Sequence, residues 1–253
     1  MRFRGRERTG SGVRVALIDS GLDTMDPRVS SAKISGWNVS LSATGHALIG
    51  AGFNDLHGHG TAMAAALLDS APDVEIVAIR IMDEGLRTTA DLMAAGIEMA
   101  YRNGARVINL SMGTPNMGKA LLLRDTAALA VQAGAVVLAA AHPKGERAYP
   151  ADLPETVGVA SHPDCGVDRL FYFDQSRFRP AEWGSLSGKF MAYGYDASGG
   201  LDPIYSGPEV ATARVAGMVA CLAEAMPEAT AEELIAALQN RALLPIPELG
   251  YAS

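Results

Sequence analysis

The chain has 253 residues, 49% of them hydrophobic, and a formal net charge of -7 at neutral pH. This length and apolar content are enough for one large domain with a substantial core, and no linker, repeat or low-complexity tract divides the sequence. The negative charge argues against binding to nucleic acid, and no apolar run reaches the roughly 20 residues that cross a bilayer. We therefore expect no nucleic-acid or membrane partner, and a cytoplasmic location.

The N-terminus is rich in arginine but lacks the apolar stretch of a secretory signal. We expect residues 1–12 to form a flexible basic tail and residues 13–253 to form a single domain. The two cysteines, Cys165 and Cys221, are expected to be free thiols, as is usual in a reducing cytoplasm.

Apolar strands alternate with amphipathic helices over the first half of the domain. Short runs rich in β-branched residues predict strands, and Ala- and Leu-rich segments that end at glycine predict helices. Strands that are apolar throughout indicate the α/β class, as a three-layer α/β/α fold with a mainly parallel central sheet. The predicted strands are 13–18, 74–81, 105–113 and 135–141, and the predicted helices are 61–70, 88–104 and 118–134.

Residues 161–205 contain aromatic residues and glycines with little periodicity. We expect loops here, with short strands lying over the edge of the sheet. The aromatic residues Phe171, Tyr172 and Trp183 indicate either local packing, which is more common for such a cluster, or contact with a partner.

Two further helices are predicted near the C-terminus. One covers residues 209–226 and is rich in small residues, and the other covers residues 230–242. Thr230 and Glu233 have the spacing of a capping box at the start of the second helix.

Binding sites in parallel α/β folds form at the carboxyl ends of the strands. Three predicted strand ends carry candidate residues. They are Asp19, Ser111 with Met112 and Gly113, and Ala141 with His142 and Pro143.

Six segments, taken in order, are more specific than any of these features alone. They are "ALIDSGLD" (16–23), "NDLHGHGTAMA" (54–64), "VINLSMG" (107–113), "GAVVLAAA" (134–141), "YPADLPETVGVA" (149–160) and "ATARVAG" (211–217). Together they resemble the motifs of the subtilisin-like serine proteases, the subtilase family. The resemblance implies the family's α/β/α fold. It places Asp19 and His59 at the catalytic aspartate and histidine, and Ser111, Met112 and Gly113 on the strand against which a substrate peptide lies.

The chain departs from this pattern at two places. The family's "GTSMATPHVAG" is here "GPEVATARVAG", so Glu209 holds the position of the serine nucleophile. The family's "AAAGN" is here "AAAHP", so His142 and Pro143 fall on the glycine and on the oxyanion asparagine. Proline has neither a side-chain donor nor a backbone N–H, so one donor of the oxyanion hole is lost. Two separate changes indicate natural divergence rather than one engineered substitution.

A nearby hydroxyl is a weak substitute for the missing nucleophile. Ser206 lies three residues before Glu209, on the other side of a Gly-Pro turn. Its use would require a shift in register, which the gap-free match of "ATARVAG" opposes.

Glu209 is predicted at the N-terminal end of its helix, where the dipole and the free N–H groups favour an anion. The resemblance places His59 between Glu209 and Asp19, and two carboxylates push an imidazole toward its charged form. Such a histidine is a poor general base near neutral pH. It is a better acid, or the centre of an ion-pair cluster.

Two functions of different classes follow from these residues. The first is a pseudoprotease that binds a peptide or a partner protein through Ser111, Met112 and Gly113 without cleaving it, if these are more than ordinary sheet-end residues. The second is a repurposed enzyme, in which Asp19, His59 and Glu209 perform acid–base chemistry on a peptide. Elimination, cyclisation, hydrolysis or another step in peptide maturation, beside a partner enzyme, would fit the second.

No cofactor or catalytic metal is expected. The "HGH" sequence places His57 two residues before His59, but His59 should begin a helix, where such side chains point apart. His57 is predicted as a turn residue.

Overall fold

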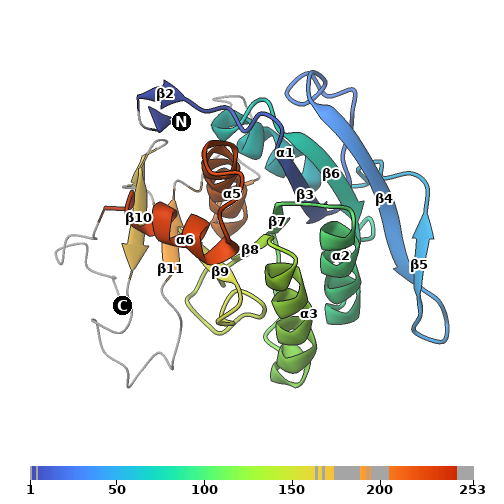
Figure 1. Ribbon diagram of the computed structural model, residues 1–253. Helices are drawn as coiled ribbons and strands as arrows, with labels where there is room; N and C mark the ends of the chain where they lie inside the picture. The colour runs from blue at the N-terminus through green and yellow to red at the C-terminus, as the bar shows by residue number, and fades with distance from the viewer. Residues whose placement is uncertain are drawn as a thin grey trace.

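The computed structural model of the protein describes residues 2–3, 5–162, 165–166, 169–173, 189–192, 194 and 205–243. Within this part, a nine-stranded sheet in the order β10-β11-β9-β8-β7-β3-β6-β4-β5 carries helices on both faces (Figure 1). Its neighbours are parallel except at the two edges, where β5 and β10 are antiparallel to β4 and β11. The three-layer α/β/α fold predicted from the sequence is therefore confirmed.

Four strands at the centre of the sheet correspond to the four predicted strands. They are β3 (Arg14–Asp19), β6 (Glu75–Arg80), β7 (Val107–Leu110) and β8 (Val136–Ala140). The outer strands are β4 (Lys33–Leu41), β5 (Ala47–Gly50), β9 (Val157–Ser161), β10 (Leu170–Phe173) and β11 (Lys189–Ala192). A separate pair, β1 (Arg2–Phe3) and β2 (Arg6–Glu7), lies near the N-terminus.

Helices cover both faces of the sheet (Figure 1). One face carries α1 (His59–Ser70), α5 (Pro208–Ala225) and α6 (Ala231–Gln239), whose side chains share one hydrophobic cluster with the sheet. The other carries α2 (Ala90–Arg102) and α3 (Ala120–Gln132), which pack on a second cluster. The short 3-10 helix η1 (Met117–Lys119) precedes α3.

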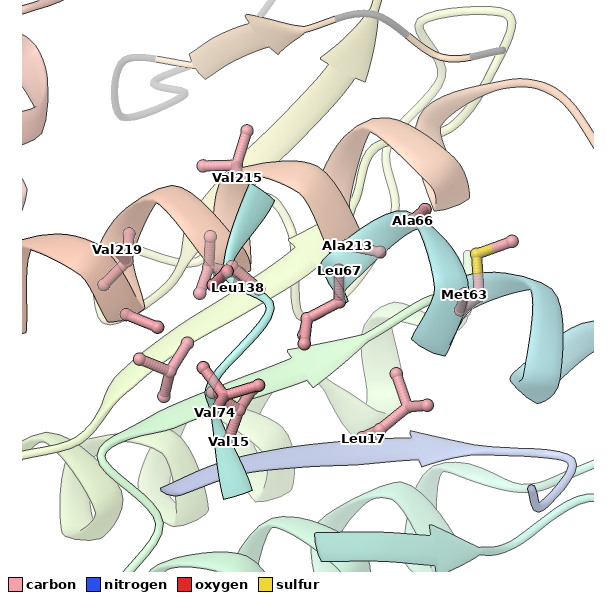
Figure 2. Close-up of a cluster of buried hydrophobic side chains, with 14 of the residues drawn as sticks. Val15, Leu17, Met63, Ala66, Leu67, Val74, Leu138, Ala213, Val215 and Val219 are labelled. Carbon is pink, nitrogen blue, oxygen red and sulfur yellow. The ribbon is translucent and has the colours of Figure 1, made fainter. Parts of the chain in front are cut away.

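Close packing of α1 on α5 holds the first of these layers together. A Cβ atom at Gly217 of α5 would lie 2.6 Å from the Cβ of Ser70 and 2.7 Å from the carbonyl oxygen of Leu67, so this crossing requires glycine. Small side chains elsewhere on α1 and α5 also allow the two helices to lie close together. Figure 2 shows the cluster that they form with the strands, including Val15, Leu17, Met63, Ala66, Leu67, Leu138, Ala213, Val215 and Val219.

The structure adds detail to the predicted elements in three places. The segment 118–134 divides into η1 and α3. β4 and β5 have weak apolar patterns, because most β4 residues are only half-buried, and the sequence predicts neither. In the segment 161–205, the described strands β10 and β11 extend the sheet edge, as expected.

Two smaller predictions are confirmed. The Thr230 hydroxyl accepts a hydrogen bond from the Glu233 N–H, and the Glu233 carboxylate accepts one from the Thr230 N–H, so the capping box is formed. Cys165 and Cys221 are both buried free thiols. Local packing also accounts for Phe171, which is buried, and for Tyr172, whose ring lies 5.1 Å from that of Phe190. Trp183 lies outside the described residues.

Part of the predicted N-terminal tail is attached to the domain. The carboxylate of Glu224 on α5 accepts hydrogen bonds from the N–H groups of Thr9 and Gly10 at 2.9 and 2.8 Å, and pairs with Arg8 at 3.1 Å. Flexibility of residues 1–7 stays a prediction. In the described part of the chain, no helix is both long and apolar enough to cross a membrane.

Candidate functional site

Asp19 and His59 meet at the carboxyl end of β3. Asp19 is the last residue of that strand and is 1% exposed, and His59 is the first residue of α1. One Asp19 carboxylate oxygen, Oδ1, lies 2.7 Å from His59 Nδ1 and also accepts the N–H of Ser20 at 2.7 Å. The imidazole is therefore held through Nδ1, and Nε2 has no hydrogen-bond partner among the described residues. Oδ2, the second oxygen of Asp19, is buried and accepts no hydrogen bond from the described residues.

Asp55 fixes the turn that presents His59. Its carboxylate accepts hydrogen bonds from the N–H groups of His57, Gly58 and Thr61 at 2.8–3.0 Å, and from two hydroxyls. Burial alone would raise the pKa of Asp55, but these hydrogen bonds outweigh it and hold the pKa below its usual value. An ionised Asp55 therefore organises the start of α1. The sequence analysis did not single out Asp55, although its position four residues before His59 could have marked it.

Glu209 is the second residue of α5, after Pro208, and its charge acts on His59. Among the described residues, no side-chain nitrogen of lysine, arginine or histidine lies within 4.0 Å of its carboxylate. Glu209 is thus near His59 without forming the ion pair that a fully satisfied three-residue cluster would contain. Its correspondence with the family nucleophile stays a prediction from the aligned motifs.

The expected direction of the pKa shift at Glu209 requires a correction. Burial raises its pKa, and the opposing effects of its own backbone N–H and of His59 do not cancel that rise. The helix N-terminus therefore does not bias this carboxyl toward ionisation as strongly as the sequence argument expects. Partial removal of the Glu209 carboxyl from water has the largest effect on its pKa.

The expected direction for His59 is confirmed. Burial alone would lower its pKa, but the charge and hydrogen bond of Asp19, with smaller effects of Glu209 and Asp55, raise it above the usual value. The imidazolium form is therefore favoured at a higher pH than in a free histidine. This weakens His59 as a general base.

Tyr205 lies just before α5 in the chain and packs against the turn that holds His57 and His59. Its ring meets that of His59 edge-on, with centroids 5.4 Å apart and an interplanar angle of 82°. Its hydroxyl lies 3.3 Å from both Nδ1 and the carbonyl oxygen of His57. The site includes Tyr205 because tertiary packing brings it to His59, and nothing in its local sequence marks it. His57 lies in the bend before α1, as predicted.

His142 and Pro143 follow β8 at the same edge of the sheet. The N–H of Lys144 donates to His142 Nδ1 at 3.3 Å, so this nitrogen serves as an acceptor. His142 is near enough to Glu209 to oppose the rise in its pKa. Pro143 offers no donor of any kind.

The predicted peptide contacts divide into two groups. Met112 and Gly113 line a cavity of about 540 Å³, whereas Ser111 is 3% exposed and its hydroxyl accepts a hydrogen bond from Asn109 at 2.9 Å. Ser111 therefore supports the strand end more than it faces a ligand. The opposite wall of the cavity comes from residues 82–93, which sequence reasoning missed.

An unusual backbone conformation lies in that wall. Leu86 has φ of 58°, and among the described residues it is the only one other than glycine with positive φ. The Asp83 carboxylate holds the surrounding turn by accepting the N–H groups of Gly85 and Arg87, both at 2.9 Å. The turn keeps Leu86 at the cavity, beside the apolar side chains of Met82 and Met93.

The described residues contain no group of three or more histidine, cysteine or acidic residues that could hold a metal ion. His57 and His59 are instead engaged by Tyr205 and Asp19. Ser206 is exposed at the residue before Gly207, outside α5.

The sheet order and the Asp19–His59 pair at its carboxyl edge define the class of subtilisin-like folds. The Subtilase family (Peptidase S8) matches residues 10–251. Subtilisin from Bacillus pumilus is 30% identical over 249 residues, which cover 92% of this chain and 85% of that protein. The chain therefore belongs to the subtilase family, and the resemblance found in the sequence is confirmed.

Two further proteins show the extent of the likeness. Subtilisin NAT from Bacillus subtilis subsp. natto is 30% identical over 255 residues, and these cover 92% of this chain but 61% of that protein. The chain thus spans less than two thirds of that relative. Among solved structures, Sphericase superposes with a TM-score of 0.72 at 23% identity, covering 94% of this chain and 86% of the other. This likeness shows the fold.

Proposed function

We propose that the protein is a subtilase-family pseudoprotease that binds a peptide or a partner protein and does not cleave it by the serine mechanism. The observation that carries the proposal is Glu209, a half-buried carboxyl at the start of α5, where the family motif has serine. A carboxylate there cannot act as the acyl-forming hydroxyl. Pro143 supports the proposal, because it removes a donor that an oxyanion would need.

A place for the ligand supports the binding role. The cavity beside Met112 and Gly113 lies next to the strand end that the resemblance assigns to substrate. Its volume of about 540 Å³ falls within the range typical of ligand pockets, and its lining combines apolar side chains, such as Leu86 and Met93, with polar ones. An extended peptide with a large apolar side chain would fit such a surface. A partner enzyme that acts on the bound peptide would fit the same arrangement.

A repurposed enzyme is the second candidate, and one observation favours it. Asp19 and His59 keep a hydrogen bond of 2.7 Å, which a binding scaffold does not need. With Glu209 opposite, these side chains form an acid–base set. In such an enzyme His59 would serve as the acid, because its pKa is raised chiefly by Asp19 against the effect of burial.

Mass spectrometry of a diverse peptide pool incubated with the full chain separates the two candidates. The same pool is incubated with His59→Ala, and retention of peptides on the immobilised wild type is measured in parallel. The binding role predicts retained peptides of unchanged mass. New termini, or a loss of water or ammonia, that disappear in His59→Ala would establish an enzyme instead.

A further inference from the structure

β5 is an outer strand of the nine-stranded sheet, and its outer edge is open. Figure 1 shows β4 and β5 at one margin of the molecule, with no helix beside β5. Ala47 is exposed, and the large side chains of Leu48 and Ile49 are 51% and 60% exposed. Gly45 and Gly52 flank the strand, and a Cβ atom on either would meet no described atom within 4 Å outside the adjacent residues. Nothing in the described part of the chain therefore covers this edge.

The other edge of the sheet is closed by the chain itself. The carbonyl oxygen of Leu243 accepts the N–H of Tyr172 in β10 at 3.1 Å, and the N–H of Leu243 donates to the carbonyl oxygen of Leu170 at 2.8 Å. Among the described residues, β10 is thus paired on both sides, whereas β5 is paired with β4 alone. An unpaired edge presents free N–H and C=O groups to another strand.

The register of the β4–β5 hairpin identifies the groups that point outward. The N–H of Ser42 donates to the carbonyl oxygen of His46 at 2.8 Å, and hydrogen-bonded pairs alternate along an antiparallel ladder. Leu48 belongs to the next hydrogen-bonded pair with β4. Ala47 and Ile49 therefore lie in the pairs without hydrogen bonds, and their N–H and C=O groups point away from β4.

The segment that contains this edge carries no formal charge. Residues 34–54 include no Asp, Glu, Lys or Arg, although these residues make up 19% of the chain. Exposed edge strands usually carry charged side chains or proline, which keep other strands away, and β5 has neither. The whole chain has a net charge of -7, so two copies repel each other on average. At this edge, two copies can meet without bringing like charges together.

We propose that β5 pairs antiparallel with β5 of a second copy of the chain, around a two-fold axis at Leu48. In this register Ala47 of each copy exchanges hydrogen bonds with Ile49 of the other, so all the outward groups are paired. The two Leu48 side chains then lie opposite each other on one face and cover each other. The edge is complementary to itself, as a two-fold interface requires. The joint sheet would carry the two Asp19 sites at opposite edges, apart from each other.

Sedimentation equilibrium of the full chain, from about 1 to about 200 µM, measures the mass as a function of concentration. We expect the mass to rise toward that of two chains. Leu48→Lys places like charges opposite each other at the axis and should weaken the dimer roughly tenfold or more. Leu129→Lys is the matched control, because Leu129 on α3 is also 51% exposed, and it should dimerise like the wild type. Thermal melts check that both variants fold.

Cysteine cross-linking under mild oxidation tests the register. Leu48→Cys brings two thiols together at a pair without hydrogen bonds, where the Cα atoms are about 4.5 Å apart and a disulfide can form. Ala47→Cys lies opposite Ile49 of the other copy, so its own thiols stay out of reach and should form little dimer. The native thiols of Cys165 and Cys221 are buried and do not compete.

A single-chain mass at every concentration would overturn the proposal, since the edge would then serve another chain or none. A dimer that Leu48→Lys leaves intact would also overturn it, because the contact would lie on another surface. Equal weakening by Leu129→Lys, or a disulfide in Ala47→Cys but not in Leu48→Cys, would contradict the proposed pairing. None of these outcomes bears on peptide binding at the Asp19 site, which the peptide-pool experiment tests separately.

Discussion

Glu209 makes the folded protein sensitive to pH. Its pKa is raised mainly by burial, so the folded state retains this proton at pH values where the unfolded chain has released it. The resulting stability is present below the ordinary glutamate pKa of 4.5 and is lost as the pH rises through the folded pKa. His59, whose pKa is also raised, acts in the same direction from its ordinary value of 6.5 upward.

Glu209→Gln should therefore gain stability relative to the wild type as the pH rises. The glutamine stays neutral, whereas the wild type must ionise a half-buried carboxyl. Urea unfolding midpoints of both proteins at pH 4.5 and pH 8 measure the difference. A difference that is constant, or that shrinks toward pH 8, would show that burial does not raise this pKa.

Leu86 should reverse the usual order of alanine and glycine. At most positions alanine is more stable than glycine by roughly 0.5–1 kcal/mol. The φ of 58° at Leu86 penalises any Cβ atom by about 1–2 kcal/mol. Leu86→Gly should therefore be more stable than Leu86→Ala by about 1 kcal/mol in chemical denaturation. Glu84→Gly and Glu84→Ala serve as the control pair, because Glu84 is an exposed residue of the same turn and its φ is not positive.

At the scale of elements, the turn before α1 depends on one carboxylate. Asp55→Ala removes acceptors from three backbone N–H groups and should lower the free energy of unfolding by roughly 3 kcal/mol. Asp55→Asn should lower it less, because the amide keeps one acceptor oxygen. Thermal melts of both variants measure the effect.

Asp125 supplies the control for this experiment. It lies exposed on α3, and among the described residues it pairs only with its neighbour Arg124 on the surface. Asp125→Ala should stay within about 0.5 kcal/mol of the wild type. If Asp55→Ala were as mild as this control, the turn would not depend on Asp55.

At the scale of the whole molecule, stability depends on the layer in which α1 and α5 pack on the sheet. Leu67 of α1 is fully buried in this layer (Figure 2). Leu67→Ala should lower the free energy of unfolding by about 3 kcal/mol, through lost packing and the cavity left behind. Leu129 on α3 is 51% exposed, so Leu129→Ala should change stability little. Denaturant unfolding of both variants tests this. Similar losses of stability in the two variants would mean that the layer of α1 and α5 does not dominate the stability of the protein.

The sequence by itself determined the class of fold and the order of its central elements. Continuous apolar runs mark buried parallel strands, and glycine stops and a capping box mark the helix ends, because these signals are local in the chain. The motifs around Asp19 and His59 also identified the family. The half-buried strand β4 and the mostly exposed edge strand β5 escaped prediction, since strands of this kind need no regular apolar pattern.

Only the tertiary structure decided how the site is charged and what surrounds it. The pKa of Glu209 depends on burial by residues far away in the sequence, and that burial outweighs the local effect of its helix end. The packing of Tyr205 on His59 and the attachment of Arg8 to Glu224 likewise join distant segments. Desolvation and distance between side chains arise from the packed fold, so local patterns of residues do not reveal them.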